Sequence, residues 1–188
     1  MGLRESVGVT PIAARQAPLL ARPYYADGDP GPIVAALAQV PEMLVVTMPF
    51  LGTVLGPSAL PARTKELVIL RTSARAACRY CVESHTVVAL GIGLSVAEVR
   101  ALRGEADVEA AFPEQADRAV LDWCDAIVGT GAVDPMVRVR LLSFFAEHEV
   151  VELTLLAAST LLLNRFCTAL ELPTPSSVLA RLAAEGLR

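Results

Sequence analysis

The sequence predicts an all-α protein, with one helical domain behind an N-terminal arm. Apolar residues recur at helical spacing through most of the 188 residues. Prolines and glycines divide these stretches into lengths that are typical of helices. No convincing alternation of apolar and polar residues predicts a strand. We place the extended arm at residues 1–32, which prolines punctuate, and the helical domain at residues 33–188.

Four helices are predicted between Ile33 and Gly93. Pro41 and Pro61 mark the starts of two of them, because proline suits the first turn of a helix. Residues 43–55 are apolar on nearly all sides, which predicts a buried helix with both of its methionines in the core. The last of the four helices carries the first two cysteines and ends at glycines.

The second half of the domain predicts five more helices. Ser95 and Glu98 form a capping box that opens a short helix. An apolar stripe predicts a helix over residues 114–128, and a long, largely buried helix is expected over Val150–Leu170. The other two are predicted over residues 134–146 and from residue 176 onward.

Composition points to self-association and away from nucleic acid. Hydrophobic residues make up 54% of the chain and charged residues 19%, with a mean hydropathy of +0.51. Because this exceeds the apolar content of an ordinary soluble monomer, we expect a homo-oligomer that covers apolar surface between subunits. The net charge of −4, the pI near 5.2 and the lack of a Lys/Arg run argue against a nucleic-acid partner.

Neither long uncharged stretch predicts a membrane span. Residues 43–62 contain prolines and glycines that break a continuous helix, and residues 153–163 are too few. The N-terminus lacks the pattern of a secretory signal. We therefore expect a cytoplasmic protein with no membrane partner. In that reducing compartment, paired thiols are catalytic or metal-binding rather than structural.

The chemistry is concentrated between Glu66 and His85, where the sequence reads E-x11-C-x2-C-x3-H. On a helix each residue advances by about 100°, so Cys78 and Cys81 lie about 60° apart and His85 about 40° from Cys81. Both thiols and the imidazole therefore share one narrow stripe. A dithiol that can close to a disulfide, beside a group that can carry a proton, indicates redox chemistry.

A C-x2-C pair at the start of a helix is suited to reaction with peroxides. The helix N-terminus lowers the pKa of a cysteine from its usual value of about 8.5 and so favours the thiolate. A peroxide can oxidise one cysteine to a sulfenic acid, which the second resolves to a disulfide. The pair can then exchange with an external dithiol. His85 can move the proton, and Glu66 can orient the imidazole.

This role for Glu66 requires a break in the helix. On one unbroken helix Glu66 would lie about 18 Å along the axis from Cys78 and about 120° around it, too far to cooperate. We therefore predict a break between about Arg71 and Cys78, so that the cysteine helix folds back. No residue between Thr72 and Ala77 is a strong helix breaker. The prediction therefore comes from function rather than from local propensity.

Two segments of the chain echo each other. Residues 66–81 align without gaps on residues 152–167, and both read E-x11-[CN]-R-[YF]-C. We interpret this as an internal duplicated helical unit, of which one copy carries the chemistry. A chance match between two Leu- and Ala-rich helices is the alternative. The duplication predicts that the two segments superpose.

Three features of the sequence are the motif, the LPARTKELVILR segment that contains its glutamate, and an Asn-Arg pair late in the chain. Together they resemble the carboxymuconolactone decarboxylase / AhpD-like alkylhydroperoxidase family. The similarity covers about residues 41–173. It implies an all-α, AhpD-like bundle that assembles as trimers or hexamers. In the branch with both cysteines, it implies reduction of hydroperoxides without a tightly bound cofactor. An external dithiol, lipoyl-type or thioredoxin-like, would supply the electrons.

Residue by residue, the resemblance assigns the proton relay to Glu66 and His85. It also implies that Cys81 attacks the peroxide and Cys78 resolves the sulfenic acid, although the residues alone leave this order open. Some members of the family have a histidine where this chain has Tyr80, so one titrating group fewer is present here.

Five further residues receive predictions of their own. Asn164 and Arg165 are, with Tyr80, the secondary site candidates. We expect Asn164 and Arg165 to be buried and to pair with helix ends or Glu66, in a role that is more structural than catalytic. Cys124 is predicted to lie in the core beside a tryptophan. Cys167 is predicted either to lie in the core or to face the dithiol. His148 is expected on the surface or at a helix cap.

The residues also leave other functions open, among them a non-catalytic sensor or structural helical module that keeps the motif. An acid–base lyase or hydrolase acting on a cyclic, lactone-like substrate would use His85 and Glu66 and would not need the thiols. A structural zinc module would take Cys78, Cys81 and His85 as ligands, with Glu66 or Cys167 as the fourth. Three ligands on one helical stripe do not readily make a closed tetrahedral site. We therefore predict a dithiol peroxidase or disulfide reductase with no metal ion.

Overall fold

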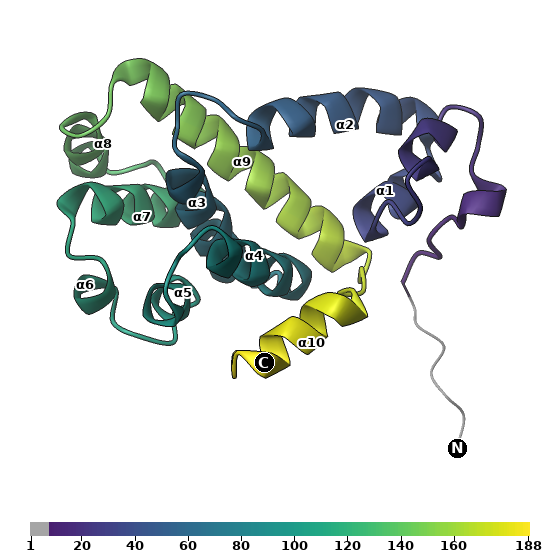
Figure 1. Cartoon of the computed structure of the whole chain (residues 1–188). Helices are drawn as coiled ribbons and strands as arrows, with labels where there is room; N and C mark the ends of the chain where they lie inside the picture. The colour runs from purple at the N-terminus through teal and green to yellow at the C-terminus, as the bar shows by residue number, and fades with distance from the viewer. Residues whose placement is uncertain (1–7) are drawn as a thin grey trace.

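The computed structural model describes residues 8–188, which form ten α-helices and two short 3-10 helices and contain no β-strand (Figure 1). The prediction of an all-α fold is therefore confirmed. In chain order the elements are η1 (Ala14–Gln16), η2 (Arg22–Tyr25), α1 (Pro32–Leu37), α2 (Pro41–Leu55), α3 (Ala62–Arg75), α4 (Arg79–Gly91), α5 (Val96–Leu102), α6 (Val108–Ala111), α7 (Gln115–Val128), α8 (Pro135–Leu142), α9 (Glu147–Ala169) and α10 (Ser176–Ala184).

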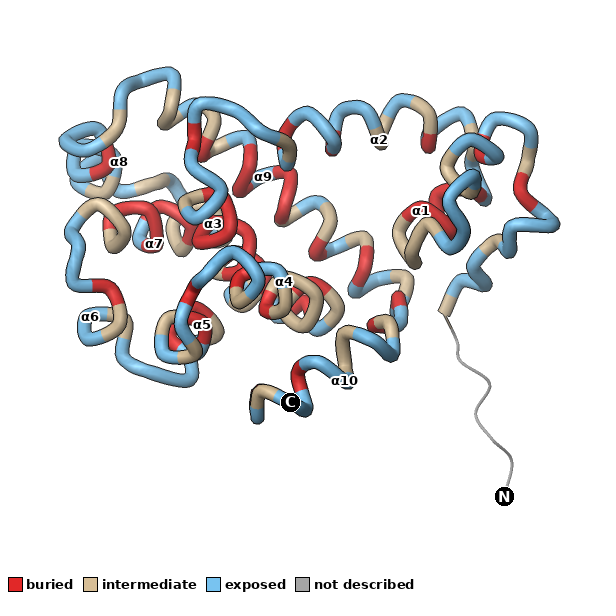
Figure 2. The backbone as a smooth tube through the Cα atoms, viewed as in Figure 1, coloured by how far each residue is buried: buried red, intermediate tan, exposed pale blue. Residues whose placement is uncertain are grey.

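Helix α3 lies at the centre of the bundle. It packs against α4, α7 and α9, and Figure 2 shows that much of α3 itself is buried. The side chains of Leu67, Val68 and Leu70 are fully buried. A run of adjacent apolar residues can be buried in a helix only when neighbours surround it. The packing of α3 therefore fixes Glu66 near its start and the turn toward Cys78 at its end.

Helix α9 crosses the bundle for 23 residues. It begins at Glu147, slightly earlier than predicted, because the Glu149 side chain accepts a hydrogen bond from the Ala146 N–H and caps the helix. By length and hydropathy α9 would suffice to cross a bilayer, a test that long core helices also pass. In this fold it packs against α2, α3, α4 and α7. Its buried face brings Asn164 and Cys167 to the site.

Helix α2 is less buried than its sequence predicts. Met43, Val46 and Phe50 are 57, 60 and 44% exposed. The opposite face packs against α1 and α9, so the prediction of a helix buried on all sides is wrong for the single chain. Of its two methionines, Met48 packs against a hydrophobic cluster and Met43 does not. Apolar side chains of α2 and α9 line an open groove of about 460 Å³.

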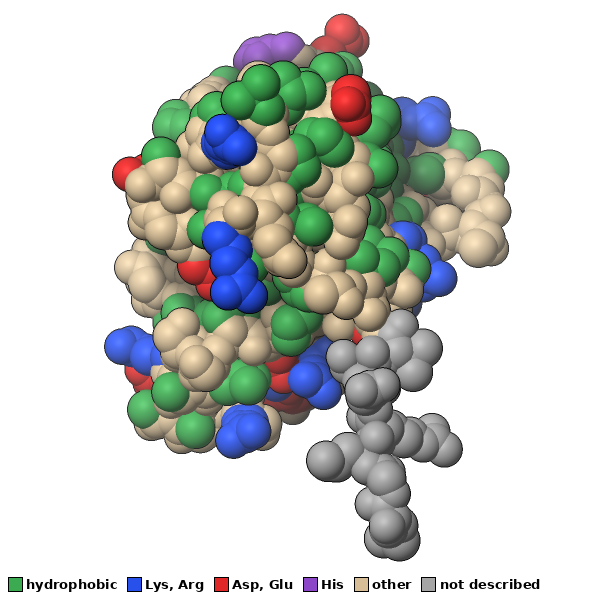
Figure 3. Space-filling view, turned by 90° about the vertical axis from the view of Figure 1, so that its right-hand side faces the viewer, with side chains coloured by type: hydrophobic (Ala, Val, Ile, Leu, Met, Phe, Trp, Pro, Cys, Tyr) green, Lys and Arg blue, Asp and Glu red, His purple; other side chains and the backbone are tan. Residues whose placement is uncertain are grey.

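The described part of the N-terminal arm packs against α1. The Ile12 N–H donates to the Ala35 carbonyl at 3.0 Å, and the Tyr25 hydroxyl donates to the Ile12 carbonyl at 2.7 Å. Tyr24 and Tyr25 pack against a hydrophobic cluster that α1 helps to form. Figure 3 shows this end of the molecule, where charged groups are scattered among apolar side chains. The first seven residues of the predicted arm lie outside the described residues.

A buried lysine fixes the loop between α2 and α3. Lys65 is 5% exposed, and its ammonium donates to the carbonyls of Val54 and Gly56 at 3.1 and 2.6 Å. It also pairs with Glu152 of α9 at 3.2 Å. The last carbonyls of a helix lack partners within it, so a cation at this end satisfies them. The contacts join α2, α3 and α9 next to Glu66.

Most predicted elements agree with the structure. Ser95 and Glu98 form the predicted capping box at the start of α5. Helix α8 ends at Leu142, earlier than the predicted 146. Helix α6, a single turn capped by Asp107, was not predicted from the sequence. So short a helix has no apolar repeat by which a sequence can reveal it.

The internal duplication is not seen in the structure. Residues 66–81 span the end of α3, a turn and the start of α4, whereas residues 152–167 lie within the single helix α9. The two segments therefore cannot superpose over their whole length, and we attribute the echo to the similar composition of the two regions. The last residues of the two segments, Cys81 and Cys167, nevertheless lie close together in the fold, with their sulfurs within 4.8 Å.

Candidate active site

The chain breaks between α3 and α4, as the motif requires. Helix α3 ends at Arg75, and Ala77 adopts a left-handed conformation with φ of +53°. The Cys78 N–H donates to the Ser73 carbonyl at 3.1 Å and closes the turn as in a Schellman motif. The predicted break between residues 71 and 78 is therefore confirmed. Glycine usually occupies such a position, so an alanine there gives no signal in the sequence.

The fold-back places His85 of α4 against Glu66 of α3. The His85 Nδ1 lies 2.8 Å from the Glu66 Oε1, and Glu66 is 4% exposed. Because a carboxylate can only accept, Nδ1 carries the proton and Nε2 is free to act as a base. Glu66 also borders an open hollow of about 450 Å³. Folding thus assembles the predicted Glu–His pair.

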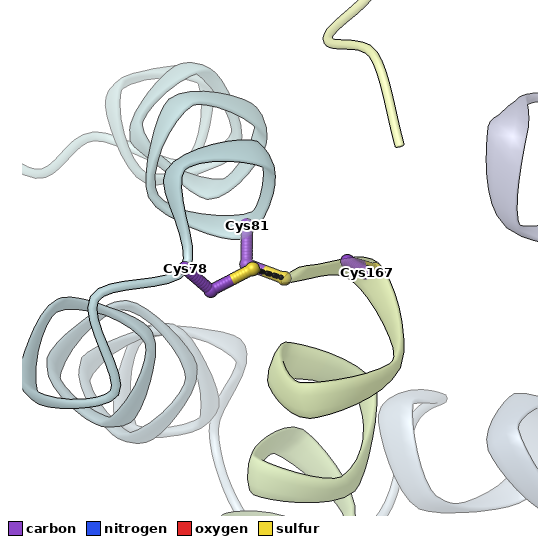
Figure 4. Close-up of side chains that lie close together, drawn as sticks. All are labelled: Cys78, Cys81 and Cys167. Atoms are coloured by element: carbon purple, nitrogen blue, oxygen red, sulfur yellow. Dashed lines mark hydrogen bonds between the residues drawn. The ribbon is translucent and has the colours of Figure 1, made fainter. Parts of the chain in front are cut away.

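Cys78, Cys81 and Cys167 form a cluster of three thiols (Figure 4). Cys78 is the N-cap residue of α4, and Cys81 lies in its first turn. Their sulfur atoms are 2.8 Å apart, and both thiols are reduced and buried. Cys167 lies in the last turn of α9, and all three sulfurs are within 4.8 Å of one another. The Cys78 and Cys81 sulfurs are thus less than 1 Å beyond the S–S bond length of about 2.05 Å.

The cluster favours one thiolate. Hydrogen bonds from Cys167 and Cys81 lower the pKa of Cys78 to about 2. A hydrogen bond with Cys167 acts to lower the pKa of Cys81, but the bond with Cys78 and burial outweigh it and raise that pKa to about 12. Hydrogen bonds with the same two thiols raise the pKa of Cys167. The negative charge therefore lies on Cys78, where the helix N-terminus also favours it.

The cluster faces two separate openings. Cys81 and His85 line a small cavity of about 30 Å³. Cys78 and Cys167 line an open groove of about 430 Å³, to which Cys81 does not contribute. Tyr80 lines both openings. The two cysteines of the motif therefore meet different surroundings.

Asn164 places a buried amide beside Cys81. Its Nδ2 donates to the Ser73 Oγ at 2.9 Å, which ties α9 to α3. Asn164 and Cys81 both line the small cavity, and the Asn164 amide acts to lower the pKa of Cys81. The structure thus places Asn164 at the site. Arg165 is exposed and lines neither the cavity nor the groove, so the expectation that it is buried is wrong.

The structure also places three other residues named in the sequence analysis. Burial raises the pKa of Tyr80 to about 12, so its phenol keeps its proton at neutral pH and can donate it in a hydrogen bond. Cys124 is fully buried in the core, as predicted, and burial raises its pKa to about 12. His148 lies on the surface, also as predicted.

The described residues do not gather the predicted zinc ligands. Within residues 8–188, the group of three or more potential ligands whose donor atoms lie close together is Cys78, Cys81 and Cys167. His85 is not among them, and its Nδ1 is bonded to Glu66. The arrangement of four ligands built on both cysteines and the histidine is therefore not formed.

The sequence left open whether Cys167 lies in the core or at the site. It also did not predict that α1 packs over the three cysteines. Ile33 and Ala36 of α1 pack with the three cysteines and Leu172 in one hydrophobic cluster. The sequence does hold a signal for Cys167, because the echo pairs it with Cys81. The cover by α1 has no local signal, since it depends on how the N-terminal segment returns across the bundle.

Several solved structures have the same arrangement of helices. The AhpD core of an uncharacterized peroxidase-related protein from Ralstonia eutropha JMP134 is 17% identical, with a TM-score of 0.74 over 90% of this chain and 96% of that one. A candidate AhpD antioxidant-defence protein of unknown function from Agrobacterium tumefaciens is 24% identical, with a TM-score of 0.67 over 74% and 94%. The debrominase Bmp8 is 20% identical, with a TM-score of 0.76 over 95% and 97%. These likenesses establish an AhpD-like fold.

The family follows from the sequence of the motif region. Residues 41–126 match the model of the carboxymuconolactone decarboxylase family, and they include all four residues of the motif. This segment, slightly under half of the chain, is similar to that family and carries a C-x2-C pair at Cys78 and Cys81. The resemblance seen in the sequence is confirmed. A comparison with curated proteins gives no significant match.

Proposed function

We propose that the protein is a thiol-dependent peroxidase, or disulfide reductase, that acts on hydroperoxides through Cys78 and Cys81. The observation that carries the proposal is the 2.8 Å approach of two buried, reduced sulfurs at the start of α4, whose His85 pairs with Glu66 of α3. The site thus supplies a nucleophilic sulfur, a second sulfur that closes the disulfide and a base that moves the proton. A lactone lyase would leave both thiols without a role.

Cys81 is the sulfur that we assign to the attack on the peroxide, because it lines the cavity with His85. Its proton passes to the free Nε2 of His85, directly or through a water molecule. The thiolate attacks one peroxide oxygen, the O–O bond breaks, and Cys81 becomes a sulfenic acid. The departing oxygen takes the proton from His85. Glu66 stabilises the imidazole while it carries the positive charge.

Cys78 is suited to resolve the sulfenic acid. Its lowered pKa keeps it ionised at neutral pH, and its sulfur already lies 2.8 Å from that of Cys81. The thiolate attacks the Cys81 sulfur, the hydroxyl group leaves as water after it takes up a proton, and a disulfide forms. Because nucleophilicity falls with pKa, such a thiolate suits a partner held in contact better than a diffusing peroxide.

An external dithiol is proposed to return the disulfide to thiols. The groove of about 430 Å³ borders Cys78, whereas Cys81 lines the small cavity. A lipoyl group or the dithiol of a thioredoxin-like protein would attack from this groove. The exchange leaves two reduced cysteines on this chain and one disulfide on the reductant, so it needs no tightly bound cofactor.

The space around Cys81 favours peroxides over larger substrates. About 30 Å³ holds one or two water-sized groups, which is enough for the two peroxide oxygens. Ile33, Leu55 and Leu163 line both this cavity and an apolar hollow of about 290 Å³, which suits the tail of an organic hydroperoxide. A bromopyrrole, such as the 2,3,4-tribromopyrrole bound by a Bmp8 variant, is larger than the cavity. We therefore propose peroxide reduction rather than debromination.

We also propose that another copy of this chain covers the exposed face of α2. Val46, Phe50 and Leu162 are 60, 44 and 55% exposed, and they line the groove between α2 and α9. Contiguous exposed apolar side chains mark an association surface, and the mean hydropathy of +0.51 favours self-association. Light scattering should give a trimer or hexamer for the wild type and a lower molar mass for Val46→Asp. A monomeric wild type would contradict this proposal.

The peroxidase proposal is tested by single-turnover oxidation of the reduced protein. Thiol loss after mixing with cumene hydroperoxide or hydrogen peroxide should be much faster than for free cysteine. Cys81→Ser should lose this fast reaction, and Cys124→Ser is the matched control because its thiol lies in the core. Wild-type thiols that react no faster than free cysteine would rule out a peroxidase. Activity on a lactone that survives replacement of both motif cysteines would favour the lyase.

A further inference from the structure

We propose that Cys167 is a third redox cysteine, which takes over the disulfide of the C-x2-C pair and carries it as a Cys78–Cys167 disulfide facing the groove. The inference rests on the proposed dithiol chemistry and extends it. The motif accounts for two thiols, and nothing in it requires a third. The fold nevertheless brings the third thiol to the other two from the far end of the chain (Figure 4).

The geometry permits exchange among all three sulfurs. Thiol–disulfide exchange requires a thiol next to a disulfide sulfur, and the Cys167 sulfur lies within 4.8 Å of both others. The end of α9 is held by a turn in which the Leu172 N–H donates to the Cys167 carbonyl at 3.0 Å. Ala36 and Leu172 pack with the cluster and shield it. The three sulfurs are therefore each other's nearest reaction partners.

The two openings show what the transfer achieves. Cys81 lines the cavity with His85, whereas Cys78 and Cys167 line the groove. The disulfide that first forms between Cys78 and Cys81 keeps the cavity sulfur oxidised. Transfer to Cys167 returns Cys81 to the cavity as a thiol and leaves the disulfide between the two sulfurs at the border of the groove, on the side from which an external dithiol would approach.

The step is an internal exchange that needs no further oxidant. The Cys167 sulfur attacks the Cys78 sulfur, the Cys78–Cys81 bond breaks, and Cys81 leaves with the electron pair. Cys167 releases its proton to solvent as it attacks, and Cys81 takes up a proton from solvent, which the Nε2 of His85 can relay, as it leaves. The cluster of three cysteines contains one disulfide and one thiol both before and after the exchange.

Trypsin separates the three cysteines, which makes the proposal directly testable. Cleavage at Arg75 and Arg79 leaves Cys78 in residues 76–79, and Cys81 lies in residues 80–100. Cys167 lies in residues 166–181. Each possible pairing of the cysteines therefore gives a different pair of linked peptides.

The full-length reduced protein is oxidised with one equivalent of diamide, which forms disulfides without peroxide chemistry. Free thiols are then blocked with N-ethylmaleimide, and the digest is mapped by mass spectrometry. We expect peptides 76–79 and 166–181 to be linked in the wild type and in Cys124→Ser. In Cys81→Ser this should be the sole linked pair. Cys81→Ala, with helix content checked by circular dichroism, guards against a folding defect of the serine variant.

The proposal is overturned if Cys167 is blocked by N-ethylmaleimide in every wild-type sample and Cys81→Ser forms no linked pair. The experiment also separates this proposal from the peroxidase proposal. Linkage of Cys167 by diamide without fast oxidation by hydroperoxide would remove the peroxidase and keep the third redox cysteine. Fast oxidation by hydroperoxide with Cys167 always free would do the reverse.

Discussion

Replacement of Glu66 by glutamine tests whether the buried carboxylate of the Glu66–His85 pair assists the proton transfer. Glu66 is 4% exposed, and its Oε1 lies 2.8 Å from the His85 Nδ1. Glutamine keeps the shape and a carbonyl acceptor, so Glu66→Gln removes the charge and retains a hydrogen bond. The imidazole becomes positive as it takes the proton of Cys81. A buried carboxylate therefore stabilises the transition state more than the resting state.

The size of the effect follows from the two kinds of hydrogen bond. Bonds to charged groups contribute about 1.5–3 kcal/mol and neutral bonds about 0.5–1.5 kcal/mol. The difference of roughly 1.4 kcal/mol corresponds to about a tenfold lower rate constant for thiol oxidation. The number of thiols oxidised per chain should not change, because the dithiol itself is intact.

The assay is stopped-flow oxidation at pH 7 with hydroperoxide in excess. Glu152→Gln is the matched control, since it removes a carboxylate that pairs with the neighbouring Lys65 at 3.2 Å. The control should oxidise at the wild-type rate. A Glu66→Gln rate within about twofold of wild type would show that the carboxylate does not assist the proton transfer, and the relay would be refuted.

Three further predictions follow from particular contacts. Because hydrogen bonds lower the pKa of Cys78 to about 2, this residue stays a thiolate from pH 4 to 8. The rate at which Cys78 is alkylated in the native protein should therefore not change over that range. A rise of about tenfold per pH unit would indicate an ordinary thiol. Asp125→Asn should lower the free energy of unfolding in urea by roughly 2 kcal/mol, because it breaks a fork of 2.6 and 2.7 Å contacts to Arg71. Asp122→Asn, in the exposed pair with Arg140, should change it by less than about 0.5 kcal/mol, and equal effects would contradict the assignment. Ala77→Gly should raise the free energy of unfolding by up to about 1 kcal/mol, because the φ of Ala77 is +53° and glycine adopts this conformation without strain. The control Ala76→Gly, at a φ of −80°, should lower the free energy of unfolding by roughly 0.5–1 kcal/mol. The opposite order would contradict the left-handed turn.

The sequence predicted most helices because their apolar stripes and end signals are local. It also predicted the break before Cys78, although by an argument from function: Glu66 could not otherwise reach the thiols. The turn itself left no local trace, since Ala77 occupies a position that usually requires glycine. A constraint from chemistry thus succeeded where helix propensity gave no signal.

The misses arise where the outcome depends on distant parts of the chain. Residues 43–55 are apolar on nearly all sides, and one sequence cannot tell a core helix from one whose outer face awaits a partner. The position of Cys167 depends on how α9 crosses α4, which periodicity does not reveal. Asn164 reaches the site and Arg165 does not, because adjacent helical residues point about 100° apart.

Trapping of the sulfenic acid tests most directly whether Cys81 is the sulfur that a hydroperoxide oxidises. The Cys78→Ser/Cys167→Ser variant lacks both sulfurs that could resolve it, so one equivalent of hydroperoxide in the presence of dimedone should label the peptide 80–100. The Cys81→Ser/Cys167→Ser variant, which keeps Cys78, should remain unlabelled. A dimedone adduct on Cys78, with none on Cys81, would contradict the account.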